Sequence, residues 1–224
     1  MRFFVLRPEG RLFGTKWAYA DILDPFNTAD VGPRCPRCNE TVGSLVWQPP
    51  YRVKLSSSKP EKWGDFLWGA GLDLAVSERF KIVYEEEGLR GIERFGPLLE
   101  VVRMGTKKTG DLTPVPPAYY LVEVAWNGAN LDDDASGMIR TRSACSYCRR
   151  GNFSRYDSIV IERESWNGAD IMKLRGLPGT IVVSQRFAEV SRSQGLRNVL
   201  LVPAEKVAYD EARLRFARGD YIKD

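Results

Sequence analysis

Two pairs of cysteines constrain the fold of this chain more than any other feature of its sequence. Cys35 and Cys38 form one CxxC pair, and Cys145 and Cys148 form another, 110 residues further along. Two residues between cysteines let both sulfur atoms of a tight turn face one metal ion, and two such turns supply the four thiolates of a tetrahedral zinc site. A chain that binds zinc in this way must fold so that the two pairs meet.

Two alternatives to zinc use the same cysteines. A thioredoxin-like redox pair needs a CxxC that opens a helix directly after a strand. Here Val31-Gly32-Pro33 precedes the first pair and Ser143-Ala144 precedes the second, and both contexts favour turns. An iron centre of the rubredoxin kind takes the same four ligands, and the sequence does not separate it from zinc. A fully cysteine-ligated zinc has no open coordination position, so we expect a structural role.

The chain also repeats itself at an offset of about 107 residues. Residues 76–80 (VSERF) match residues 183–187 (VSQRF), and residues 88–90 (GLR) match residues 195–197. Of the 17 positions from 76 to 92, 8 are identical in the second copy, where chance gives about one. The repeat indicates an internal duplication. It would also bring the two CxxC turns together by a pseudo-twofold arrangement, despite their separation along the chain.

Each copy reads as a strand, a helix and a second strand. Short β-favouring stretches lead to a serine that can accept hydrogen bonds from the free N–H groups of a helix start. An apolar face headed by phenylalanine follows, and a glycine is placed as a left-handed C-terminal cap. The residues with these roles are Leu72, Leu74, Val76, Ser77, Phe80 and Gly88 in the first copy, and Ile181, Val183, Ser184, Phe187 and Gly195 in the second.

Arg79 and Arg186 occupy the first turn of these expected helices, where a cation opposes the helix dipole. A buried ion pair with Asp65 or Asp170 is one explanation. The two aspartates themselves, placed alike in the two copies, are also the candidate acid and base of a carboxylate enzyme. A duplicated structural role, as a cap or an ion-pair partner, explains equally well why both copies keep one.

These features predict one α+β domain over residues 1–224, built from two pseudo-equivalent strand-helix-strand halves. Each half follows a CxxC zinc turn, and the halves share one zinc site. The first half covers residues 31–103 and the second covers residues 144–210. Between them, residues 104–143 hold a linker (105–117), a strand (119–126) and an exposed loop (127–137).

Composition removes several catalytic classes. The chain has no histidine, which excludes Ser-His-Asp triads, Cys-His nucleophiles, HExxH metalloproteases and histidine-containing zinc fingers. The N-terminal apolar run Phe3-Phe4-Val5-Leu6 is closed by Arg7, far short of a signal-peptide core. We therefore expect a cytoplasmic protein without a membrane partner, in a reducing compartment that favours cysteine as a metal ligand.

The two CxxC turns, the short Arg2-Phe3-Phe4 start and the closing SxRF and GLR pattern resemble the myxobacterial double-CXXCG motif family. The resemblance covers most of the chain, from Met1 to about Val207. Members of that family are similar to SitI-type immunity proteins, which protect a cell from its own toxin. The resemblance implies a non-enzymatic protein whose partner is a cognate toxin, with no small-molecule substrate, and a structural Zn²⁺ held by Cys35, Cys38, Cys145 and Cys148.

The chain departs from the family pattern just after each CxxC, where the family has glycine. Asn39 stands there in the first turn and Arg149 in the second. Asparagine tolerates the left-handed conformation that such a glycine takes, whereas arginine does so less readily. The geometry of the second turn is therefore the less certain half of the expected zinc site.

A toxin-binding surface is harder to locate from the sequence. If the toxin is a nuclease, an acidic patch that mimics nucleic acid is expected. The two acidic clusters available are Glu85, Glu86 and Glu87, and Asp132, Asp133 and Asp134. A solvated loop tip is the plainer interpretation of the aspartates, because they lack the glycine pivot of a calcium loop.

The alternative function is a zinc-ribbon module that binds nucleic acid. Arginines would contact phosphates, and the six tryptophans would stack on bases. Against this stand a net charge of only +4 and the absence of a basic-aromatic stripe. Four of the arginines also flank the cysteines, where they would offset the net negative charge of zinc with four thiolates. The five candidate arginines are Arg34, Arg37, Arg149 and Arg150, which flank the cysteines, and Arg155.

Overall fold

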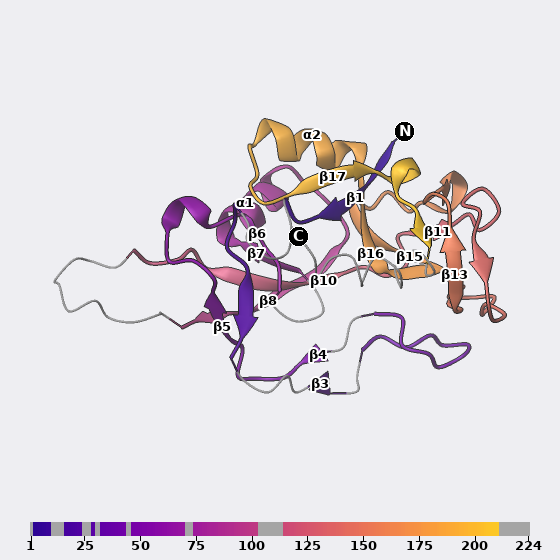
Figure 1. Ribbon diagram of the computed structural model, residues 1–224, viewed down its shortest axis with the longest axis horizontal. Helices are drawn as coiled ribbons and strands as arrows, with labels where there is room; N and C mark the ends of the chain where they lie inside the picture. Colours follow the sequence, from indigo (N-terminus) through magenta and orange to yellow (C-terminus); the bar gives the residue numbers. More distant parts are fainter. Residues whose placement is uncertain are drawn as a thin grey trace, which may run out of the picture.

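A computed structural model describes residues 2–9, 16–23, 28–29, 32–43, 46–69, 74–102 and 114–210 (Figure 1). Within these ranges the fold is dominated by five β-sheets. The helices are α1 (Glu78–Glu86) and α2 (Gln185–Ser193), with short 3₁₀ turns η1 (Pro60–Lys62), η2 (Arg163–Ser165) and η3 (Ala204–Lys206).

The strands follow in chain order. They are β1 (Phe3–Arg7), β2 (Ala20–Ile22), β3 (Thr28–Ala29), β4 (Val46–Trp47), β5 (Arg52–Leu55), β6 (Phe66–Leu67), β7 (Leu74–Ser77), β8 (Ile92–Leu98), β9 (Glu100–Val101), β10 (Tyr119–Val124), β11 (Ala129–Leu131), β12 (Ile139–Arg140), β13 (Phe153–Tyr156), β14 (Ile161–Glu162), β15 (Ile171–Arg175), β16 (Leu177–Ser184), β17 (Leu200–Pro203) and β18 (Tyr209–Asp210).

The largest sheet has six strands in the order β14-β11-β15-β16-β1-β17. Its β1 strand explains the N-terminal apolar run, because both faces of the strand are covered. Phe4 and Leu6 join a core shared with both helices, while Phe3 and Val5 join a second core on the opposite face. The apolar run is thus an interior strand of the fold.

A second sheet has four strands in the order β6-β7-β10-β8, and α1 follows β7 directly. The side chains of α1 and α2 meet in the core between this sheet and the six-stranded one. Phe80 and Phe187 are fully buried there, with ring centroids 6.2 Å apart. Smaller sheets, β2-β5-β9, β12-β13-β18 and β3-β4, complete the described part of the fold.

Both helix starts and both helix ends agree with the sequence prediction. The hydroxyl oxygens of Ser77 and Ser184 accept hydrogen bonds from the third following backbone N–H, at 3.2 and 3.1 Å. Gly88 and Gly195 follow the helices with left-handed φ values of 58° and 57°. The repeated residues therefore encode the local geometry of α1 and α2.

The prediction of two strand-helix-strand halves is wrong, because strands dominate and the two strands of each expected half do not pair with each other. The strand after α1, β8, pairs with β10, and the strand after α2, β17, pairs with β1. Strands β10 and β1 also pair with β7 and β16, so each lies in the middle of its sheet. A repeat within a short segment predicts where helices and turns begin. It does not predict which distant strands pair with that segment in a sheet.

The repeated segments contact each other reciprocally instead. The N–H groups of Asp65 and of the next residue donate to the Arg197 carbonyl oxygen, at 3.0 and 3.2 Å. The N–H groups of Asp170 and of its next residue donate to the Arg90 carbonyl oxygen, at 2.7 and 3.1 Å. The GLR end of each copy is thus held by the aspartate of the other.

The segment between the copies matches its prediction only in part. Residues 119–126 contain the expected strand, β10. Residues 127–137 are not simply an exposed loop, since they contain β11, and Leu131 and Ser136 are fully buried. Leu72 and residues 105–113 of the expected linker lie outside the described residues. In the described part of the chain, no helix has the length and apolar character to cross a membrane.

Candidate metal centre

The fold brings the two CxxC pairs together. The Sγ atoms of Cys35, Cys38, Cys145 and Cys148 all lie within 4.8 Å of one another. The Sγ atoms of Cys35 and Cys145 are 3.9 Å apart, and those of Cys38 and Cys148 are 3.7 Å apart. At a Zn–S distance of about 2.3 Å, tetrahedral geometry places sulfur atoms about 3.8 Å apart. The four side chains therefore fit one metal ion, and zinc is compatible with them.

The two CxxC turns have the same internal structure, and we call them the first knuckle (residues 34–41) and the second knuckle (residues 144–151). The N–H of Arg37 donates to the Cys35 sulfur and the N–H of Tyr147 to the Cys145 sulfur, both at 3.4 Å. Asn39 and Arg149 close the turns, with N–H groups 2.9 and 2.8 Å from the first cysteine's carbonyl oxygen.

The residues that directly follow the two CxxC pairs both take the left-handed conformation. The φ angle is 59° at Asn39 and 55° at Arg149. Arg149 thus adopts the left-handed backbone conformation despite its side chain. A β-carbon is unfavourable in this conformation, which glycine adopts without strain.

The local environment shifts the pKa values of the cysteine thiols in different directions. Burial acts to raise the pKa of Cys35, but hydrogen bonds from the backbone N–H groups of Cys38 and Arg37 lower it to about 6. Burial raises the pKa of Cys148 to about 12. The half-exposed Cys145 has a lowered pKa, chiefly because the N–H groups of Cys148 and Tyr147 donate to it. The N–H groups that donate to the first cysteine of each knuckle therefore favour its thiolate form, which is the form that binds metal.

An acidic pocket of about 380 Å³ adjoins the second knuckle. The pocket is lined by three predicted partner-binding residues, the aspartates at positions 132–134, together with Cys145, Arg149 and Glu162. The lining residues are Asp132, Asp133, Asp134, Ala144, Cys145, Ser146, Arg149 and Glu162. Asp133 forms a bidentate ion pair with Arg140, whose Nε and Nη2 atoms lie 2.5 and 2.7 Å from the carboxylate oxygens.

The second acidic cluster lies elsewhere. Glu85 and Glu86 are exposed near the end of α1, while Glu87 follows the helix and accepts a hydrogen bond from Gln194 Nε2 at 2.9 Å. Figure 1 places α1 and β11, which precedes the aspartates, on different sides of the fold. The two clusters are therefore separate surfaces.

The ion pairs expected for Arg79 and Arg186 are present, but only their aspartate partners are buried, because the arginine side chains are about half exposed. Asp65, 2% exposed, accepts hydrogen bonds from Ser77 Oγ at 3.0 Å and from Arg79 Nη1 at 2.6 Å. Asp170, 3% exposed, accepts from Ser184 Oγ at 2.7 Å and from Arg186 Nη1 at 3.1 Å. Each carboxylate thus binds the serine and the arginine at the start of one helix. This supports a structural role for the two aspartates over a role as a catalytic acid and base.

Several of the arginines proposed for nucleic-acid contacts form ion pairs within the molecule. Arg155 pairs with Asp157, and Arg149 pairs with Glu162. The tryptophans do not form an exposed stacking surface, because each is buried or packs against a hydrophobic core: Trp17, Trp47, Trp63, Trp68, Trp126 and Trp166.

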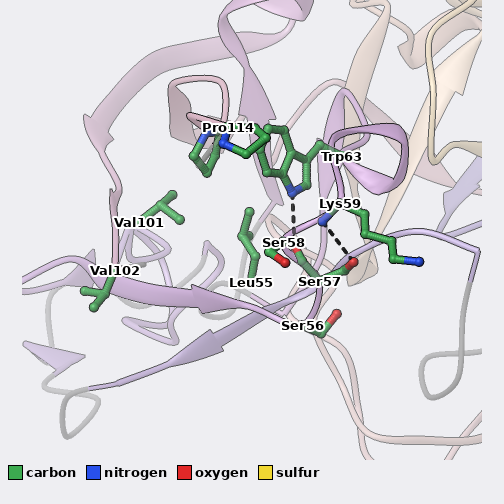
Figure 2. A pocket seen from close by; sticks show the side chains of 10 residues that line it. Leu55, Ser56, Ser57, Ser58, Lys59, Trp63, Val101, Val102 and Pro114 are labelled. Atoms are coloured by element: carbon green, nitrogen blue, oxygen red, sulfur yellow. Dashed lines mark hydrogen bonds between the residues drawn. The ribbon is translucent and has the colours of Figure 1, made fainter. Parts of the chain in front are cut away.

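A separate apolar cavity of about 260 Å³ lies where β5 and β9 end (Figure 2). Leu55, Val101 and Trp63 line it, with Pro114 close to the indole ring and the Lys59 ammonium group extending away. The Trp63 indole N–H donates to the Ser57 carbonyl oxygen at 3.0 Å. No predicted site residue lines this cavity, and its lining does not resemble the metal centre.

Sequence reasoning missed two features of the centre. Glu162 pairs with Arg149, and the Arg175 guanidinium stacks on Trp126 and Tyr147, 5.5 and 4.7 Å from their ring centroids. The one available signal was Arg149 itself, a bulky residue where glycine is usual.

Comparison with known proteins bears on this architecture. The model of an immunity protein family, Imm11, matches residues 65–206, which is more than half of the chain. The match includes both helices, both buried aspartates and the second knuckle, whereas Cys35 and Cys38 precede it. A search of curated proteins finds no match.

Proposed function

Because this chain belongs to the Imm11 immunity protein family, we propose that it binds a cognate bacterial toxin and neutralises it by binding, without catalysis. The family membership is the single observation that carries the proposal. The geometry is compatible with it, since the four cysteines and the two buried aspartates all have structural explanations. The double CxxC arrangement further supports placing the chain with double-CXXCG, SitI-type immunity proteins.

We propose that the four cysteines hold one structural Zn²⁺. Their sulfur spacing matches a tetrahedral site, and the matching N–H···S hydrogen bonds of the two knuckles support it. A bound zinc would connect the first knuckle, in the N-terminal part, to the second knuckle beside the six-stranded sheet. Free thiols suit the cytoplasm of the producing cell, where we expect the protein to act.

For the toxin-binding surface we propose the acidic pocket beside the second knuckle. Asp134 is exposed there, whereas Asp133 is paired with Arg140 and Asp132 accepts a hydrogen bond from the Ala135 N–H. Asp134 is therefore the carboxylate of this cluster that is best placed to meet a basic side chain of a partner. The exposed end of α1, with Glu85, Glu86 and Glu87, is the alternative surface.

The test is a pull-down against the product of the neighbouring gene, as the candidate toxin, followed by titration of the purified pair. We expect a stoichiometric complex. Asp134→Lys should weaken it by at least ~10-fold, since repulsion replaces a charge contact. Glu164→Lys, an equal charge change at an exposed residue of η2, is the matched control and should change affinity little.

The other outcomes are equally informative. If Glu86→Lys weakens the complex and Asp134→Lys does not, the end of α1 is the toxin-binding surface. If the chain binds no toxin but binds random DNA or RNA with a steep salt dependence, the nucleic-acid module replaces the immunity function. Elemental analysis of the same sample should give one zinc per chain.

A further inference from the structure

The Arg149 side chain spans two neighbouring strands of the six-stranded sheet. Its Nη1 atom donates to the carbonyl oxygen of Leu131, in β11, at 2.9 Å, and also to the carboxylate of Glu162, in β14. These strands are paired antiparallel. Glu162 is itself held by Asn130 Nδ2 at 2.9 Å. One guanidinium therefore ties the end of the second knuckle to the edge of the sheet.

Further contacts fix the same knuckle. The N–H of Gly176, between β15 and β16, donates to the Cys148 carbonyl oxygen at 3.1 Å. Tyr147 stacks against the Arg175 guanidinium, which also contacts Trp126. Cys148 is 2% exposed as a result. The second knuckle is thus attached to the sheet through its side chains and its backbone, independently of a metal.

In the described part of the chain, the matching position of the first knuckle makes no such side-chain contacts. Asn39, at the position that matches Arg149, is exposed, and among the described residues its side chain makes no hydrogen bond. Cys38 is exposed as well. The described contacts between the knuckles include those of the cysteines and the ion pair of Arg150 and Glu40, whose Nη1 and Oε2 atoms are 4.0 Å apart. Among the described residues, the two knuckles therefore share a backbone conformation but differ at this position, since Arg149 contacts the sheet through its side chain and Asn39 does not.

We propose that Arg149 is the positioning residue of the metal centre. It accepts an unfavourable left-handed backbone conformation and holds Cys145 and Cys148 as a preformed half-site to which metal attaches the first knuckle. This inference rests on the proposed metal centre. It assigns Glu162 to the same role through its ion pair with Arg149, because supporting residues outside the ligand set orient metal ligands.

The test is titration of the metal-free full chain with Co²⁺, whose visible spectrum reports a tetrahedral four-thiolate site. Arg149→Gly removes the guanidinium and relieves the backbone, so glycine should be neutral or better if conformation alone matters. We expect it instead to weaken Co²⁺ binding by ~10-fold or more. Asn39→Gly is the matched control at the other knuckle and should leave the affinity unchanged or slightly improved.

Two further measurements keep the test decisive. Glu162→Gln, which retains Arg149, should weaken Co²⁺ binding in the same direction, and Arg149→Lys should partly restore it. Hydrogen exchange of the metal-free chain should become faster at residues 144–151 in Arg149→Gly, but not in Asn39→Gly. Unchanged or tighter Co²⁺ binding by Arg149→Gly overturns the proposal. If the wild-type chain binds no Co²⁺ or Zn²⁺, the metal centre itself fails, and unchanged exchange would then reject the anchor as well.

Discussion

Arg186, in the first turn of α2, donates a hydrogen bond to the carbonyl oxygen of Gly88, just past the end of α1, at 3.1 Å. Arg79, in the first turn of α1, likewise donates to the Gln194 carbonyl oxygen at the end of α2. Each arginine opposes the dipole of its own helix but satisfies the negative end of the other. Each also pairs with a buried aspartate. The repeated arginines therefore hold the two helices together.

Removing either buried carboxylate should destabilise the fold without affecting any activity directly. Asp65→Asn and Asp170→Asn leave an arginine without its partner and disturb the contact with the other copy's GLR segment. We expect each to lower the free energy of unfolding by about 2–4 kcal/mol. Urea unfolding measures this. Asp157→Asn, at an exposed ion pair, should cost under about 1 kcal/mol, and equal effects at the three sites would contradict the account.

Gly91 should not tolerate a side chain. It has φ 115°, and a β-carbon would lie 1.8 Å from the Ile171 carbonyl oxygen, where the two large sheets meet. We expect Gly91→Ala to cost about 3 kcal/mol or more. Gly96 has a similar φ of 121° but nothing within 4 Å of such a β-carbon, so Gly96→Ala should cost about 1–2 kcal/mol. Thermal unfolding of both variants measures the two losses of stability. The difference between them gives the cost of the steric clash at Gly91 beyond the cost of backbone strain.

The ion pair of Glu162 should make stability depend on pH. A hydrogen bond from Asn130 and the Arg149 guanidinium lower the pKa of Glu162 below its ordinary 4.5. A carboxyl with a lowered pKa stabilises the folded state above its unfolded pKa, and this contribution is lost as pH falls through the folded value. Glu162→Gln should therefore cost about 0.5–1 kcal/mol at pH 7 and progressively less below about pH 4.5.

The matched control for this profile is Glu164→Gln, two residues along and exposed. The free energy of unfolding of Glu164→Gln should differ from that of the wild type by close to zero across the same pH range. A Glu162→Gln effect that is constant from pH 7 to pH 3 would show that the carboxylate charge is not the source of the stabilisation.

Metal removal should destabilise the wild-type chain and leave a cysteine variant unchanged. Cys148→Ser removes one thiolate, so it should contain little zinc and unfold at the same temperature with or without a chelator. The wild type should unfold at a lower temperature once the chelator is added, because a metal that binds the folded state stabilises it. Ser146→Ala, in the same knuckle but not a ligand, should behave like the wild type.

The parts of the fold that the sequence predicted are those encoded by neighbouring residues. Ser77 and Ser184 begin helices because a serine hydroxyl satisfies a free N–H three residues later. The cysteine pairs were expected to meet because only convergent thiolates form a metal site. These predictions needed no knowledge of how the sheets are connected.

Strand pairing could not be predicted in this way. Strand β10 lies between β7 and β8, and β1 lies between β16 and β17. Strands that pair across such long distances in the sequence share no local sequence pattern. The prediction of two strand-helix-strand halves was wrong for this reason. The same reason hid the support for Arg149, whose acceptors in β11 and β14 are identified only once those strands are seen to lie side by side.

The most direct test of the immunity function is the growth of cells that express the product of the neighbouring gene, as the candidate toxin, with and without this chain. The account predicts that the chain restores the viable count to that of cells with an inactive toxin, and that the two proteins purify together. Growth arrest in cells that contain the folded chain, with no complex between the two proteins, would contradict it.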